Sequence, residues 1–349
     1  MNSLILQKQE EVIALAQFDI KDAVLKKCLL KEDETVITVP DGVTTIGKDA
    51  LCGLQSVIAV TLPESLKVIN DGAFYGCSSL TSVTLPGSVE RLGSCAFAQC
   101  SALNTIYLDN KLTEIGNSAF WGCTSLESID IPAGVTKIGY NLFGSCLSLI
   151  SVSLPDTVTE LDERAFKECT SLACITLPDS LIKIGNMAFL NCHNLKSVNI
   201  PDRLESIGEK AFFMCESLHE LEIPDGIASV GGDAFSDCVS VTVRSTISGK
   251  PLYKAVTATD GSSAYNFILR NIWDKGGFDF TAQDNYFPAL QDENLQYAIA
   301  FSRLMYRVNL SASAEEHYLD FLHNNAENAV RYCITQDLSL IHISEPTRP

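Results

Sequence analysis

Residues 80–100 have the sequence LTSVTLPGSVERLGSCAFAQC, and this stretch recurs along the chain. Its proline occupies a position that repeats every 23 residues without insertion or deletion, at Pro40, Pro63, Pro86, Asp109, Pro132, Pro155, Pro178, Pro201 and Pro224. A fixed period of roughly 20–50 residues is typical of a solenoid, in which each unit buries its apolar face only against its neighbours. The sequence therefore predicts nine stacked coils.

Two further positions keep the same period and predict columns of side chains inside the solenoid. Phenylalanine fills one of them from Phe74 to Phe235, and cysteine fills the other from Cys77 to Cys238. A repeated ring can stack on its copies, and a thiol behaves as a small buried hydrophobe. The cysteines of this column are therefore expected to be free thiols in the core, and neither disulfides nor zinc ligands.

A short strand is expected in every unit. In the quoted stretch, Val83 and Leu85 alternate with Ser82 and Thr84, which is the pattern of a strand with one buried face. Pro86 ends the strand because proline has no N–H for a ladder bond. We expect one such strand per coil.

A glycine position follows the strand, at Gly93 in the quoted stretch, and Asn70 and Asp162 replace the glycine in two other coils. Asn and Asp are the residues after glycine that best tolerate left-handed backbone, so we expect a positive φ at this position. The segment at 96–100, AFAQC, is expected to form a short helical or 3₁₀ turn on the outer side.

These repeated residues resemble the leucine-rich repeats of the BspA-like, Treponema pallidum type over about residues 35–243. The shared unit is Leu-x-x-Ile-x-Ile-Pro-x-x-Val-x-x-Ile-Gly-x-x-Ala-Phe-x-x-Cys, and the departures are Asp109 for proline and Leu142 for alanine. The resemblance implies a curved α/β solenoid with a parallel sheet on one side. It also implies interaction rather than catalysis.

The segments around the repeats are expected to cap and extend them. We place the solenoid at residues 35–249 and an N-terminal cap at 1–34, formed by a short helix near 4–16 and a β turn, because an open end coil would face water. Residues 250–337 change to helical periodicity, and are expected to form a small, truncated all-α segment in which Ser313 and Glu316 make a capping box.

The last residues, 338–349, are expected not to be native protein. They resemble the in-frame translation of the transposase adapter used to prepare sequencing libraries, and they continue the preceding helical pattern badly. The natural protein is therefore expected to continue past Asp337.

Composition limits the classes of partner. The chain has 349 residues and a formal charge of −18, with no basic stripe, so nucleic acid and anionic membranes are not expected as partners. No signal peptide or membrane span is recognisable, which predicts a cytoplasmic protein as written. Many proteins of the resembled family are secreted or surface-bound, and a misassigned start would place this chain with them.

Three short motifs imitate functional sites. The segment at 42–48, GVTTIGK, has P-loop spacing until Asp49 stands where Ser or Thr should bind magnesium. Cys192 and His193 are adjacent, but neighbours on a turn point apart. A row of aspartates follows four prolines, and we interpret it as solvated turn residues rather than a calcium site: Asp156, Asp179, Asp202 and Asp225. We expect that the protein is not an enzyme and that it binds no cofactor and no metal.

The outward strand positions are expected to carry the function. They form a flat, hydroxyl-rich surface that becomes acidic toward its C-terminal end, although Thr and Ser are also ordinary exposed strand residues. Contacts with a partner are expected at Tyr107, Asp130, Asn199, Glu220 and Glu222. Tyr107, beside the Asp109 departure, is the main expected anchor.

The sequence therefore predicts a non-enzymatic scaffold that binds a protein partner through the outward face of the repeat sheet. A carbohydrate or a host surface stays open as a ligand. The alternative is a rigid spacer or cell-surface adhesin whose activity resides in a missing C-terminal domain.

Overall fold

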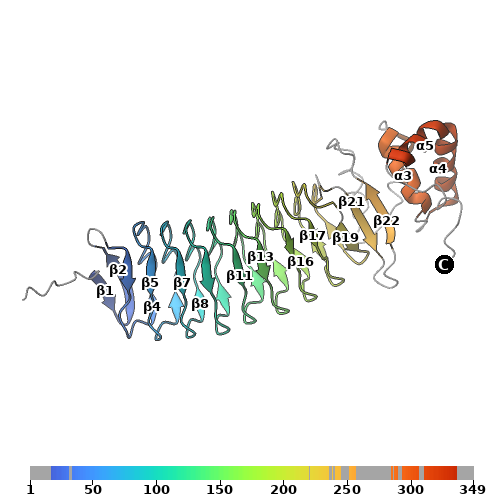
Figure 1. Ribbon diagram of the computed structural model, residues 1–349. Coiled ribbons are helices and arrows are strands. Elements are labelled where there is room, and N and C mark those ends of the chain that lie inside the picture. Colours follow the sequence, from blue (N-terminus) through green and yellow to red (C-terminus); the bar gives the residue numbers. More distant parts are fainter. Residues whose placement is uncertain are drawn as a thin grey trace, which may run out of the picture.

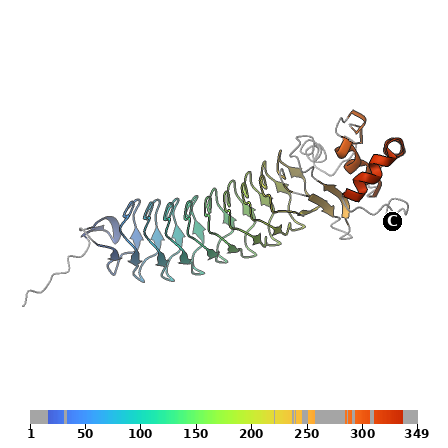
Figure 2. The same cartoon turned by 45° about the horizontal axis from the view of Figure 1, so that its top comes forward.

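The computed structural model describes residues 17–30, 34–219, 221–235, 238, 240–244, 251–256, 284–285, 287–289, 293–305 and 310–335. Figure 1 shows an elongated array of coils, with a β hairpin at one end and short helices at the other. The coils are displaced progressively along a gentle curve (Figure 2). The predicted solenoid of about nine turns is confirmed, with repeats of 23 residues in register throughout.

The predicted strand is present in every coil. Neighbouring strands pair in parallel, as in Ile37 with Val60, although the pairing is interrupted at three places along the array. We call the surface that these strands form the first side. The strands are β3 (Val36–Thr38), β5 (Ala59–Thr61), β7 (Ser82–Thr84), β9 (Thr105–Tyr107), β11 (Ser128–Asp130), β13 (Ser151–Ser153), β15 (Cys174–Ile175), β17 (Ser197–Val198) and β19 (Leu221–Pro224).

A second strand in each coil corrects the expectation of one strand per coil. These strands also pair in parallel, with one interruption midway along the array, and form what we call the second side. They are β4 (Thr45–Ile46), β6 (Val68–Ile69), β8 (Arg91–Leu92), β10 (Glu114–Ile115), β12 (Lys137–Ile138), β14 (Glu160–Leu161), β16 (Lys183–Ile184), β18 (Ser206–Ile207) and β20 (Ser229–Val230). With two residues each, they are too short to show the alternation that reveals a strand in sequence.

The third side of each coil is a run of turns, so the expected helical or 3₁₀ turn is wrong. Its N–H groups alternate between two kinds of acceptor. Cys52 N–H donates to Asp49 O within the coil at 3.1 Å, whereas Leu51 N–H donates to Ala73 O of the next coil at 2.9 Å. Because every second N–H is directed to a neighbouring coil, no helical run can form.

Glycine is required at its repeat position for a different reason from the one expected. Positive φ values recur two and six residues after it, as at Cys95 (54°) and Gln99 (60°), but not at Gly93 itself. A Cβ on Gly93 would lie 2.4 Å from the backbone nitrogen of Asp71 in the preceding coil. The position excludes a side chain because adjacent coils approach closely, and the expectation of a positive φ there is wrong.

The phenylalanine column is confirmed. The eight rings from Phe74 to Phe235 are buried, and successive rings stack with centroids 4.8–6.0 Å apart and interplanar angles of 4–16°. Offset stacking of this kind stabilises the interior beyond the burial of apolar area. It links each coil to the next from the second coil to the ninth, whereas the first coil has Leu51 at this position.

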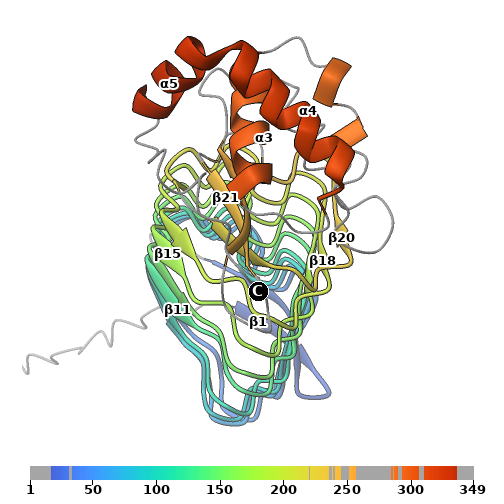
Figure 3. The same ribbon diagram turned by 90° about the vertical axis from the view of Figure 1, so that its right-hand side faces the viewer.

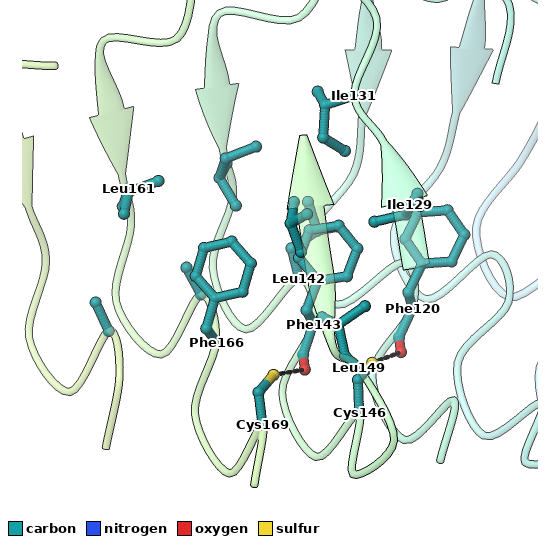
Figure 4. Close-up of a cluster of buried hydrophobic side chains, with 14 of the residues drawn as sticks. Phe120, Ile129, Ile131, Leu142, Phe143, Cys146, Leu149, Leu161, Phe166 and Cys169 are labelled. Carbon is teal, nitrogen blue, oxygen red and sulfur yellow. Dashed lines mark hydrogen bonds between the residues drawn. The ribbon is translucent and has the colours of Figure 1, made fainter. Parts of the chain in front are cut away.

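The cysteine column is hydrogen-bonded to the backbone of the phenylalanine column. Cys146 Sγ donates to Phe120 O at 3.2 Å, and Cys169 Sγ donates to Phe143 O at 3.1 Å (Figure 4). Burial raises the pKa of Cys123 to about 12 and raises the pKa of Cys146 and Cys169 as well. No described cysteine forms a disulfide.

A hairpin stands where the N-terminal cap is expected. Strands β1 (Gln17–Lys21) and β2 (Val24–Leu29) pair antiparallel around residues 22–23, which both have positive φ. Strand β2 then pairs in parallel with β4, so the hairpin extends the second side. The expected helix near residues 4–16 lies outside the described residues.

The C-terminal end changes from coils to a hairpin and helices. Strand β21 (Ser240–Arg244) pairs with β19, and β22 (Pro251–Val256) pairs antiparallel with β21. The 3₁₀ turn η1 (Phe287–Ala289) and the helices follow: α3 (Glu293–Met305), α4 (Ala312–Asn324) and α5 (Ala326–Thr335). Helix α3 contacts β22, and Figure 3 shows the helices at this end of the array. Residues 338–349 lie outside the described residues.

A buried ion pair joins the helices. Arg303 has no exposed area and holds the Asp284 carboxylate at 2.8 and 2.9 Å, and the Tyr318 hydroxyl donates to the same carboxylate at 2.6 Å. Helix α4 is capped by Ser311, whose hydroxyl accepts from Ala314 N–H at 3.1 Å. The cap therefore lies two residues before the expected capping box at Ser313.

Candidate partner-binding surface

Tyr107 is the most exposed large apolar side chain in the described part of the chain, at 68%. It ends β9, where Ile106 points into the core and the residues on either side point outward. We call the outward side chains of the first-side strands the strand face. The strand alternation that buries one residue therefore fixes Tyr107 in solvent on a rigid support.

Asp130 occupies the position next to Tyr107 in the following coil, at the end of β11, and it is also exposed. Strands β9 and β11 lie side by side. The Asp109 departure does not disturb the turn between them: Leu112 N–H donates to Asp109 O at 3.0 Å, as its counterparts donate to proline carbonyls in other coils. The structure therefore places an exposed aromatic ring and an exposed carboxylate on neighbouring strands of two successive coils.

Asn199 lies on the strand face but uses its amide within the coil stack. Its Nδ2 donates to Leu177 O at 2.8 Å, and its Oδ1 accepts from Leu177 N–H at 2.7 Å. The amide thus continues the pairing of β15 with β17 by one further step. This structural role of Asn199 could not be expected from its sequence position.

The remaining candidates lie toward the C-terminal end. Glu222 is exposed on β19, and Glu220 lies outside the described residues. At about 5 Å per coil, Asn199 stands some 15 Å from Asp130 along the array. The predicted residues therefore form two separate pairs, Tyr107 with Asp130 and Asn199 with Glu222, and their role in binding stays a prediction.

A row of alternating charges on the second side was missed in the sequence. Arg91 Nε lies 3.0 Å from Glu114 Oε2, and Glu160 is held between Lys137 at 3.2 Å and Lys183 at 2.7 Å. These five residues occupy one repeat position in five successive coils. Comparing signs at that position would have revealed the row, since residues 23 apart lie side by side.

The ammonium groups of this row hold the neighbouring carboxylates ionised. The hydrogen bond from Lys183 lowers the pKa of Glu160 against the opposing effect of burial. Burial raises the pKa of Asp162, but Lys137, 2.9 Å away, outweighs it, so the net pKa is lowered. The same contacts raise the pKa of Lys137.

We expect Glu160→Gln to lower the free energy of unfolding at pH 7 by about 0.5–1 kcal/mol, because both ion pairs lose their charge. The folded pKa of Glu160 lies below its unfolded value, so the pairs stabilise the fold above about pH 4.3 and less as pH falls through the folded pKa. Urea unfolding from pH 7 to pH 2 measures this, and the difference from wild type should vanish at the acid end. The control is Glu90→Gln, since Glu90 is exposed and forms no ion pair within the described residues.

A shallow groove of about 490 Å³ continues the second side at its C-terminal end. Lys183, Asn186 and Glu209 line it, together with three glycines of the repeat position: Gly185, Gly208 and Gly231. These glycines carry no side chain into the groove, and a Cβ at each of them would meet the backbone of the preceding coil.

The structure does not give the sequence motifs that imitate functional sites the geometry of such sites. Within the segment at 42–48, Thr45 and Ile46 form β4, and a turn rather than a helix follows. The Cys192 thiol points inward to Phe166 O, away from His193. Among the described residues, no group of three or more His, Cys, Asp or Glu is placed to hold a metal ion.

The chain is a repeat protein whose fold is a parallel β-solenoid with a rigid outward face. The chain belongs to the family described as BspA type leucine rich repeat region, whose model matches residues 19–150 and 136–250 in six copies. The resemblance carried by the repeat residues is thereby confirmed. No match is found among curated proteins.

Several solved structures are similar to this chain. A leucine-rich repeat protein from Bacteroides ovatus is 20% identical, with 68% of this chain and 90% of that chain covered and a TM-score of 0.46. A leucine rich cell surface protein from Faecalibacterium prausnitzii is 23% identical, covering 76% and 96%, with a TM-score of 0.41. The T. pallidum leucine rich repeat protein is 26% identical, covering 64% and 86%, with a TM-score of 0.40.

The helices of the C-terminal region are short. Among the residues that the structure describes, none is both long and apolar enough to cross a bilayer.

Proposed function

We propose that this chain is a non-enzymatic scaffold that binds a protein partner through the strand face, with Tyr107 and Asp130 at the centre of the contact. The observation that carries the proposal is the 68% exposure of the Tyr107 ring beside an exposed carboxylate. Aromatic side chains dominate the energy of protein interfaces, because they bury a large area at little entropic cost.

The partner is expected to present a basic surface around an apolar pocket. The formal charge of −18 attracts cationic proteins over long range, and Asp130 offers a local acceptor for arginine or lysine. Complementary charge of this kind mainly raises the association rate, whereas the ring supplies the affinity. Two observations support binding over catalysis: the chain belongs to a repeat family, and the Cys192 thiol points inward, away from His193.

A rigid spacer or cell-surface adhesin is the second candidate. This candidate is favoured by one similar structure, which is described as a leucine rich cell surface protein. In this case the stacked coils hold an active C-terminal domain away from a surface. The genomic sequence on both sides of the coding region distinguishes the candidates, since an export signal or a further domain would favour the spacer.

Capture experiments test the strand face directly. Tyr107→Ala on the immobilised protein is expected to reduce capture of the partner at least tenfold, and Asp130→Ala is expected to reduce it less and in a salt-dependent way. The matched control is Ser153→Ala, an exposed position one coil beyond Asp130. Undiminished capture by both test variants would show that the partner binds elsewhere.

A further inference from the structure

The outer edge of β1 has no strand partner among the described residues. Strand β1 is the terminal strand of the sheet ordered β1-β2-β4-β6-β8-β10, at the N-terminal end of the array in Figure 1. Four of its five residues are exposed. Of its two apolar residues, Phe18 packs against the core and Ile20 is 38% exposed. An open strand edge is a template for another strand, because its N–H and C=O groups point outward unpaired.

The pairing within the hairpin shows which groups point outward. Lys21 pairs with Val24 across a two-residue turn, and this pair exchanges its hydrogen bonds inside the hairpin. The backbone groups of the preceding residue, Ile20, therefore face the open edge. The register shift beside Ile20 does not alter this, because the extra residue, Lys26, lies on β2.

We propose that the β1 edge binds the β1 edge of a second copy of this chain, antiparallel, with Ile20 on the two-fold axis. In this register Asp19 lies opposite Lys21 of the second copy, and the symmetry repeats the ion pair. A register shifted to Asp19 would place two aspartates opposite each other, and one shifted to Lys21 would do the same with two lysines. Opposite charges directly across a pair of strands stabilise it and like charges destabilise it, so the charges of β1 favour the register centred on Ile20.

The charge of the hairpin favours contact at this end. Residues 17–29 contain three lysines and two aspartates, whereas the chain as a whole has a formal charge of −18. Two copies that meet through their hairpins therefore bring together segments that lack the negative charge of the chain as a whole. Leu29, 52% exposed on the same hairpin, adds apolar area that such a contact can cover.

This association is independent of the proposed partner binding. It would join two solenoids through their N-terminal ends and give the assembly two strand faces. A ligand with two binding sites would then be held by both faces, which raises its apparent affinity without any new contact.

Charge exchange tests the register. Sedimentation equilibrium of the full chain at increasing concentration is expected to show a monomer–dimer equilibrium. Asp19→Lys alone and Lys21→Asp alone are each expected to weaken dimerisation at least tenfold, because each places like charges opposite one another. The double variant restores both ion pairs with their signs exchanged, and it should dimerise like the wild type.

Cross-linking tests the two-fold axis. Residues on the axis of such a pair have Cα atoms about 5.5 Å apart, which suits a disulfide. Ile20→Cys is therefore expected to give a covalent dimer under mild oxidation, with the linked peptide confirmed by mass spectrometry. The control Gln17→Cys, which lies opposite position 23 of the second copy, should not. A wild-type chain that stays monomeric at all concentrations, a double variant as weak as the single ones, or equal cross-linking of both cysteine variants would overturn the proposal.

Discussion

Phe143→Ala is expected to lower the free energy of unfolding by about 3–5 kcal/mol. The Phe143 ring is fully buried and stacks between Phe120 and Phe166, with centroid distances of 5.7 and 5.4 Å. Truncation leaves a cavity that the neighbouring coils can close only by losing their own register, so little of the cost can be relieved. Chemical denaturation measures the change.

The position of the damage is as informative as its size. Because each coil contacts only its neighbours, hydrogen exchange should accelerate first in the coils on either side of residue 143 and less at the ends of the array. The control is Ile150→Ala, a substitution at a side chain 54% exposed in the next coil, expected to change stability by no more than about 0.5 kcal/mol. Uniform acceleration along the whole chain would contradict the nearest-neighbour description.

Gly116→Ala is expected to cost about 1–3 kcal/mol through overpacking. A Cβ there would lie 2.3 Å from Ser94 N and 2.4 Å from Gly93 C, both of them backbone atoms of the preceding coil that cannot rotate away. Thermal and urea unfolding of the variant measure the cost.

Substitution by asparagine distinguishes a steric reason for the glycine from a conformational one. At Gly53, where φ is +72° and no atom lies within 4 Å of an added Cβ, asparagine should be better tolerated than alanine, because it adopts left-handed backbone more readily. At Gly116 asparagine should be at least as harmful as alanine. If asparagine rescued position 116, a left-handed backbone and not the close approach of coils would explain the glycine.

The period of 23 predicted most of the fold. It fixed the number of coils, the buried columns and the neighbours of every residue, because a solenoid repeats one environment. It did not predict the third side, whose left-handed positions hold residues such as Met187 and Lys210 that have no preference for that backbone. There the conformation is imposed by hydrogen bonds to the adjacent coil, and the local sequence carries no sign of it.

The candidate surface was predictable only in part. The adjacency of Tyr107 and Asp130 follows from the period alone. The two bonds from Asn199 to the backbone of Leu177 depend on how far one side chain reaches across the stack, which a pattern of residue types does not encode. The charge row from Arg91 to Lys183 was visible in the repeat register but required comparison of signs between coils.

The protonated thiols of the cysteine column have a consequence for redox chemistry. The thiolate is the species that attacks disulfides and oxidants, and burial, which raises the pKa of Cys123 to about 12, keeps this thiol protonated at neutral pH. Exchange with glutathione or an oxidising enzyme therefore requires that a coil first opens. The cysteine column resists oxidation as long as the array stays folded. The buried thiols of this column therefore carry no information about the redox potential of the compartment in which the protein works, whereas Cys52 and Cys174 are exposed.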